Sequence, residues 1–163
     1  MALSDFTSPD DVRACLGVSP KELDNSVLLL DMHAAGLSEE LLEMGDTLEA
    51  DYLAIAALPQ GDLTAAQQRF VNLTKLFSAL SVSKTLAGSL SMFSPKKITD
   101  GKAAVERFVD AYAGMKEALA INYSTIRTKL IAAYAATGGA VAVSGTARNY
   151  MVVSAGADPV TGT

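Results

Sequence analysis

The feature that most constrains the fold is a long stretch whose apolar residues recur every three or four positions. This stripe consists of Val105, Phe108, Tyr112, Met115, Leu119, Tyr123, Ile126 and Leu130. Alternating spacings of three and four place these side chains on one side of an α-helix of roughly eight turns. Alanines fill the other sides, so we expect this helix to pack on more than one face. The fold class is therefore predicted to be mainly α.

A second segment with the same periodicity precedes this helix. It begins after Asp62 or Thr64, either of which can cap it, and contains Phe70, Leu73, Leu76, Phe77 and Leu80. A loop with the sequence SMFSPKKITDGKAAVERF, residues 91–108, joins the two segments. Two long helices over about 62–86 and 102–136 predict an antiparallel helix hairpin on which a helical bundle is built.

The N-terminal part carries strong helix-boundary signals. Ser8 is a good N-cap, Pro9 suits the first helical position, and Gly17 is typical of a helix end. Ser19 and Glu22 match the S-x-x-E capping box of a second helix start. We therefore expect short helices in this part of the chain.

Two further segments follow before the hairpin. Residues 26–32, SVLLLDM, are compatible with a short β-strand, although their leucines leave a helix open. From Ser38 the pattern is helical, with a possible break near Gly45 and an end by Pro59.

The C-terminal residues 137–163 differ in composition from the rest of the chain. They are rich in Gly, Val, Thr and Ser, and residues 149–154, NYMVVS, are strand-like. The pattern predicts a short β element and an extended C-terminal arm that lies on a neighbour. We expect a single domain, 1–163, with an acidic N-terminal part (1–61), the helix hairpin (62–136) and this arm.

Charge is divided unevenly along the chain. Residues 1–62 hold 13 acidic and 2 basic residues, whereas residues 63–163 hold 5 acidic and 11 basic ones. Such a division suits head-to-tail self-association, in which an acidic face meets a basic one, and it also fits two solvated faces of an ordinary domain. The mean hydropathy of +0.26 is high for a free monomer and favours subunit contacts.

The basic loop between the predicted long helices does not match a nucleotide-binding motif. Only Gly101 and Lys102 agree with G-x-x-x-x-G-K-[ST], and Ala103 stands where the motif needs a hydroxyl. A helical nucleic-acid-associated protein that uses the basic region 84–102 is the alternative function. Its candidate residues are Lys84, Lys96, Lys97 and Lys102.

No combination of residues in the sequence indicates catalysis. Cys15 and His33 are the only residues of their types, and both are interpreted as core residues. Glu39 and Glu43 share a helix face, but an E-x-x-H partner motif is missing. A solvated or channel-facing acidic surface explains these carboxylates better. We therefore predict no enzyme, no cofactor, no metal and no catalytic residues.

The sequence does not predict a membrane protein. The N-terminal residues lack the basic and apolar regions of a signal peptide. The uncharged run 130–147 approaches the length of a membrane span, but Gly138 and Gly139 interrupt it. We expect a soluble chain that is intracellular when it is made.

Three segments together resemble a known family. These are DVRACLGVSPKELDNSVLLLDMHAAGLSEELLEMGD (11–46), MFSPKKITDGKAAVERF (92–108) and ARNYMVVSAGADPVTGT (147–163). They are similar to the head–tail connector proteins (adaptor or head-completion proteins) of tailed bacteriophages, in the gp6-like connector family. The opening DVRACLGVS resembles the family's D-[VL]-R-x-x-L-G-[VI]-[SP] pattern.

The resemblance implies a helical virion protein without enzymatic activity, located in the phage neck. Such a subunit assembles as a homo-oligomeric ring, commonly a dodecamer, between the portal protein and a downstream tail or nozzle protein. Packaged DNA passes through the lumen of the ring without specific binding. The interaction candidates are Lys96, Lys97, Lys102, Arg148, Tyr150 and Asp158, and the lumen candidates are Glu39, Glu43 and Asp46.

Overall fold

The computed structural model describes residues 2–93, 97–100, 103–106 and 113–141, with side chains for residues 2–88 and 113–141. Its helices are α1 (Pro9–Leu16), α2 (Asn25–Leu28), α3 (Asp31–Leu42), α4 (Leu48–Ala56), α5 (Ala65–Phe93) and α6 (Ala113–Ala136), with short 3₁₀ turns at Leu3–Asp5 and Gln60–Asp62. Two short strands, β1 (Lys97–Asp100) and β2 (Ala103–Glu106), pair in antiparallel register. The described chain is mainly helical, which confirms the predicted class.

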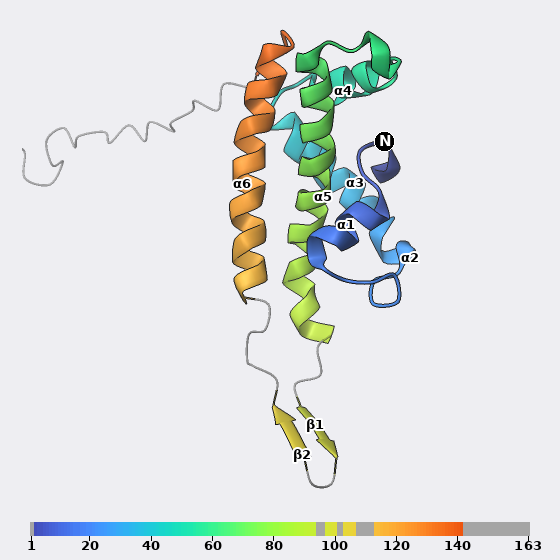
Figure 1. Cartoon of the computed structure of the whole chain (residues 1–163), viewed down its shortest axis with the longest axis vertical. Coiled ribbons are helices and arrows are strands. Elements are labelled where there is room, and N and C mark those ends of the chain that lie inside the picture. Colours follow the sequence, from blue (N-terminus) through green and yellow to red (C-terminus); the bar gives the residue numbers. More distant parts are fainter. Residues whose placement is uncertain (1, 94–96, 101–102, 107–112, 142–163) are drawn as a thin grey trace, which may run out of the picture.

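Helices α5 and α6 lie side by side and run in opposite directions (Figure 1). Residues of the predicted apolar stripes form this contact, and three of them, Phe70, Phe77 and Leu130, are fully buried. Helices α1, α3 and α4 pack against α5, so the N-terminal part completes the core beside the two long helices.

Helix α5 extends beyond the predicted end near residue 86, to Phe93, and its buried polar residues satisfy their hydroxyls within the helix. Thr74, Ser78 and Ser83 are buried, and each donates a hydrogen bond to the carbonyl four residues earlier at 2.7–2.9 Å. This pairing removes the cost of burying a hydroxyl. Small side chains at these positions also let neighbouring elements approach, and Ser83 Oγ donates to the Val12 carbonyl of α1 at 3.2 Å.

The boundaries of α1 follow the local rules. Ser8 Oγ accepts a hydrogen bond from the Asp11 amide at 3.2 Å, and Pro9 occupies the first turn. Gly17 ends the helix with φ of 65°, a left-handed conformation that glycine adopts without strain. The buried Arg13 donates from Nε to the Leu23 carbonyl at 2.9 Å and so ties α1 to the next segment.

Two predicted segments take a different form in the structure. The β-compatible run 26–32 is not a strand, because its residues belong to α2, to the start of α3 and to the turn between them. The Ser19–Glu22 hydrogen bonds form at 2.8 and 2.9 Å, but they close a turn and not a helix. The helix predicted from Ser38 begins earlier, at Asp31, and the expected break near Gly45 separates α3 from α4.

The predicted start of the second long helix is also wrong. Residues 103–106 form β2, whose Ala103 pairs with Asp100 of β1, and α6 begins only at Ala113. Helical spacing shows which side chains share a face once a helix exists, but it does not fix the residue at which the helix begins. The stripe residue Val105 therefore belongs to β2, and Phe108 and Tyr112 lie outside the described residues.

A row of four stacked aromatic rings connects the N-terminus to the end of α6. Phe6 stacks on Tyr52 at 4.8 Å between ring centroids, Tyr52 meets the edge of Phe70 at 6.3 Å, and Phe70 stacks on Tyr134 at 5.3 Å. All four rings are almost completely buried. Offset and edge-to-face contacts of this kind add to the free energy of burial.

Two glycines make room for the last ring in this row. A Cβ on Gly139 would lie 2.2 Å from Tyr134 Cε2, and one on Gly45 would lie 2.8 Å from Tyr134 Cε1. Any side chain at either position would collide with the ring. The Thr-Gly-Gly sequence after α6 therefore has a packing role.

Among the described residues, no helix combines the length and the hydropathy needed to cross a bilayer. Part of the uncharged run 130–147 lies outside these residues.

Candidate functional site

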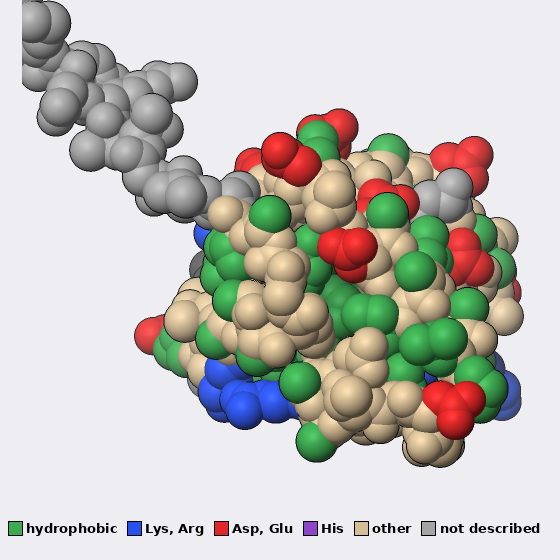
Figure 2. Space-filling model, turned by 90° about the horizontal axis from the view of Figure 1, so that it is seen from above, with side chains coloured by type: hydrophobic (Ala, Val, Ile, Leu, Met, Phe, Trp, Pro, Cys, Tyr) green, Lys and Arg blue, Asp and Glu red, His purple; other side chains and the backbone are tan. Residues whose placement is uncertain are grey.

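The three lumen candidates lie on an exposed acidic surface at the end of α3. Glu39, Glu43 and Asp46 are all exposed. Glu43 Oε2 accepts from Arg127 of α6 at 3.4 Å, an ion pair whose glutamate side chain is 70% exposed and which therefore contributes little stability. In a view down the long axis, most visible acidic side chains occupy the upper half of the face and most of the basic ones lie near its lower edge (Figure 2). The structure thus separates charge in space over part of its surface.

Tyr123 connects three helices beside this acidic surface. Its ring contacts Phe77 of α5 at 5.1 Å between centroids, and the Nζ atom of Lys84 lies 3.9 Å above the same ring. Burial, followed by the nearby Glu40 carboxylate of α3, raises the pKa of Tyr123 to about 12. The same ring holds the Lys84 ammonium through a cation–π contact, although Lys84 remains exposed to solvent.

Most of the predicted interaction residues lie outside the described residues. This is so for Lys96, Lys102, Arg148, Tyr150 and Asp158. Lys97 begins β1, where its backbone is paired in register with Glu106.

Cys15 and His33, the two residues considered for nucleophilic chemistry, both lie in packed surroundings. Cys15 is half-buried, and burial is the main cause that raises the pKa of its thiol. His33 is buried on α3, and its Nε2 atom has no hydrogen-bond partner within the described part of the chain. In the same part of the chain, no group of three or more His, Cys, Asp and Glu residues is arranged to hold a metal ion. Both residues therefore belong to the packing of α1 and α3.

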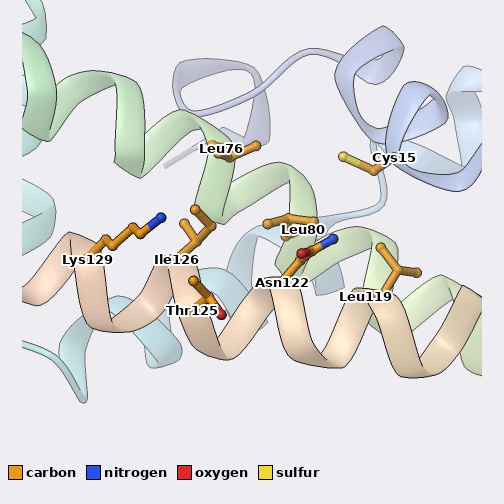
Figure 3. A pocket seen from close by; sticks show the side chains of 8 residues that line it. All are labelled: Cys15, Leu76, Leu80, Leu119, Asn122, Thr125, Ile126 and Lys129. Atoms are coloured by element: carbon orange, nitrogen blue, oxygen red, sulfur yellow. The ribbon is translucent and has the colours of Figure 1, made fainter.

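The structure reveals a hollow that sequence reasoning misses, between α5 and α6. Its volume is about 360 Å³, and Figure 3 shows the residues that line it: Cys15, Leu76, Leu80, Leu119, Asn122, Thr125, Ile126 and Lys129. Aliphatic side chains form the base, while Asn122, Thr125 and Lys129 add polar atoms. Leu76 remains 42% exposed here although it belongs to the predicted apolar stripe of α5. The only signal in the sequence is an excess of leucines on that helix.

A second apolar surface lies at the junction of α2 and α3. Four neighbouring residues expose a large part of their side chains: Val27 (38%), Leu29 (49%), Leu30 (48%) and Met32 (64%). The same residues make the run SVLLLDM compatible with a strand. Its surplus of apolar residues is the signal that this segment makes an unpartnered surface.

Comparison of the chain with protein-family profiles, with curated protein sequences and with solved structures returned no match.

Proposed function

We propose that this chain is a head–tail connector subunit of a tailed bacteriophage. Copies of it form a ring, of about twelve subunits by analogy with the family it resembles, beneath the portal protein in the neck of the virion. The ring extends the DNA channel and offers a platform to a downstream tail or nozzle protein. The subunit has no catalytic activity and needs no cofactor.

The observation that carries this proposal is the amount of apolar and charged surface that is left without a partner. Leu29, Leu30 and Met32 each expose about half of the side chain or more. Exposure of clustered large apolar side chains costs solubility unless a partner covers them. An assembling subunit accounts for this surface, whereas a reaction centre would need a constellation that the described side chains do not form.

The pattern that carries the family resemblance supports the proposal in a different way. In the segment DVRACLGVS, Val12 and Leu16 are buried, Arg13 is held by the Leu23 carbonyl, and Gly17 has the left-handed conformation. These residues shape the first helix and its connection to α2. The pattern is therefore a folding signature, as expected for a family that shares a scaffold and no chemistry.

In the proposed ring, each remaining region of the subunit has a role. The subunit body is a helical bundle built on a hairpin of α5 and α6, and the basic residues Lys96, Lys97 and Lys102 belong to the segment that joins them. Glu39, Glu43 and Asp46 face the channel, where acidic side chains repel the DNA backbone and let it slide. Arg148, Tyr150 and Asp158 belong to an extended arm, including a short β element, that contacts a neighbour or the portal.

Binding to the portal is the direct test of this function. The chain, purified without tags, is mixed with the portal ring of the same phage and analysed by sedimentation velocity. The proposal predicts that the chain moves with the portal boundary in saturable amounts. A truncation that lacks residues 158–163 should keep the helical circular dichroism signal and bind more weakly. If the full chain never comigrates with the portal ring, the proposal fails.

The same samples test the nucleic-acid alternative. Salt-dependent binding to duplex DNA that is lost in a variant with Lys84, Lys96, Lys97 and Lys102 changed to alanine would favour a nucleic-acid-associated protein. We expect Lys84 to contribute least to such binding, because its Nζ atom already lies over the Tyr123 ring.

A further inference from the structure

Two apolar surfaces on the described chain have charged residues of opposite sign beside them. The first is the α2–α3 knob, defined by Val27, Leu29, Leu30 and Met32. The second is the α5–α6 groove, defined by the lining of the 360 Å³ hollow and by its continuation toward the C-terminal end of α6. The knob residues do not line the groove, so neither surface is covered by the other in the same copy.

The groove extends beyond the hollow itself. A second hollow of about 300 Å³ is lined by Ala65, Ala66, Arg69, Ala132, Ala133 and Ala136. Arg69 precedes Leu76 by seven residues, and Ala133 and Ala136 follow Lys129 by four and seven. These spacings keep the lining residues on one face of each helix. The two hollows therefore lie along the same side of the helix pair and together make up the α5–α6 groove.

The rim of the groove is basic. Lys129 lines the first hollow and Arg69 the second, and both residues are exposed. Within the described part of the chain, neither cation belongs to an ion pair. A partner that fits this groove brings aliphatic side chains for the floor and carboxylates for the rim.

The knob offers these groups. Val27, Leu29 and Leu30 lie between Asp24 and Asp31 in the sequence, Met32 follows Asp31, and both aspartates are exposed. Asp24 Oδ1 accepts the Ser26 amide at 2.8 Å, and Asp31 begins α3. Among the described residues, neither carboxylate belongs to an ion pair. The knob is thus an apolar segment with two exposed carboxylates beside it.

We propose that the α2–α3 knob of one copy docks in the α5–α6 groove of a second copy. Leu29, Leu30 and Met32 enter the apolar floor, and the flanking carboxylates approach Lys129 and Arg69. The inference names the subunit contact of the ring proposed above and rests on that proposal for its biological setting. Because knob and groove are different surfaces, the contact is heterologous, and each added copy leaves one knob and one groove open.

Removal of the apolar anchors is the first test. Sedimentation velocity over a range of concentrations is carried out on the wild type, on a Leu30→Ser/Met32→Ser variant and on Leu58→Ser. Leu58 is 45% exposed and lies outside both surfaces, so it is the matched control. We expect the wild type to associate beyond a dimer, the double variant to dissociate about tenfold or more readily, and the control to behave as the wild type.

A charge exchange tests the pairing of the two surfaces. Asp31→Lys and Lys129→Glu each place like charges at the contact and should weaken association at low salt. In an equimolar mixture, every groove of one variant faces a complementary knob of the other, so association should return. Lys75→Glu reverses a lysine charge in the same way as Lys129→Glu, but on α5 and outside the groove lining. It should have little effect, either alone or in the mixture.

Several results overturn the proposal. A wild type that stays monomeric at all concentrations excludes the contact, and if deletion of residues 142–163 then allows association, the chain's own C-terminal residues occupy the groove. The contact is also excluded if the knob variant associates like the wild type, or if mixing the two charge variants does not restore association. If the chain binds the portal but its self-association does not depend on the knob, the contact is wrong and the proposed function stands. If self-association depends on the knob but the chain does not bind the portal, the proposed function is wrong and the contact stands.

Discussion

The hydroxyl of Tyr134 fastens the end of α6 to α4, and its removal by Tyr134→Phe is a demanding test of the described core. The hydroxyl donates to Asp51 Oδ2 at 2.5 Å and lies 2.8 Å from Thr47 Oγ1. Thr47 Oγ1 also donates to Asp51 Oδ2 at 2.9 Å, so the three groups form a closed network. The substitution keeps the ring and its stacking on Phe70 and deletes only the oxygen.

The size of the effect follows from these partners. A hydrogen bond to a charged group contributes about 1.5–3 kcal/mol, and one between neutral groups about 0.5–1.5 kcal/mol. Asp51 is partly exposed and keeps the Thr47 hydrogen bond, so water recovers part of the loss. We therefore expect Tyr134→Phe to lower the free energy of unfolding by about 2 kcal/mol, which corresponds to about 4–8 °C in Tm for a chain of this length.

Urea unfolding followed by circular dichroism measures this loss. Tyr52→Phe is the matched control, because it removes a single hydrogen bond to the Asp5 carbonyl at 3.1 Å and should cost about 1 kcal/mol. In an Asp51→Asn background, the loss at Tyr134 should shrink by about 1 kcal/mol, since the two groups are coupled. A loss below about 0.5 kcal/mol, or an equal loss in both backgrounds, would refute the reasoning.

Three further predictions concern the same core. Gly139→Ala should cost about 2 kcal/mol or more, because its Cβ would meet the Tyr134 ring at 2.2 Å, whereas Gly61→Ala, with no atom within 4 Å, should be near neutral in the same urea assay. Arg13→Met should cost about 2–3 kcal/mol in thermal unfolding, because the Leu23 carbonyl loses its charged donor. The pKa of Tyr123 is raised from 10.0 to about 12, so between these pH values the unfolded chain releases the proton while the folded chain keeps it. The free energy of unfolding should therefore fall as the pH rises from about 10 toward 12. Tyr123→Phe should make that alkaline loss of the urea midpoint shallower, and an unchanged slope would contradict the assignment.

Local rules predict the helix boundaries where backbone and side chain act within one turn. Ser8, Pro9 and Gly17 bound α1 as expected. At the start of α5, the Thr64 hydroxyl accepts the Gln67 amide at 3.3 Å. The same rules fail to give a helix after Ser19, because a cap stabilises a helix start only where the following residues also have helical packing partners.

The strand pair shows a different limit. The sequence between Asp100 and Ala103 is Gly-Lys, and Gly-X is a typical two-residue hairpin turn. Sequence reasoning instead extends the apolar stripe backward through Val105, because spacing alone cannot distinguish a helix from a short strand at its edge. The described part of the stripe that belongs to α6 packs as predicted, with Leu119 and Leu130 buried.

The two apolar surfaces could not be predicted from sequence. Leu76 and Leu80 have the same helical periodicity, yet Leu80 is 5% exposed and Leu76 is 42% exposed. The difference depends on which elements cover α5, a property of the tertiary arrangement. Likewise, only the folding of residues 26–32 into two helices and a turn shows that Leu29 and Leu30 remain about half exposed in the described chain.

Imaging of the portal complex tests the central proposal most directly. Negative-stain electron microscopy of portal rings, with and without this chain, would show whether it adds density at one end of the portal. The proposal predicts a second ring on the channel axis with a central opening. Portal particles that look the same with and without the chain, at concentrations well above those needed for its self-association, would contradict it.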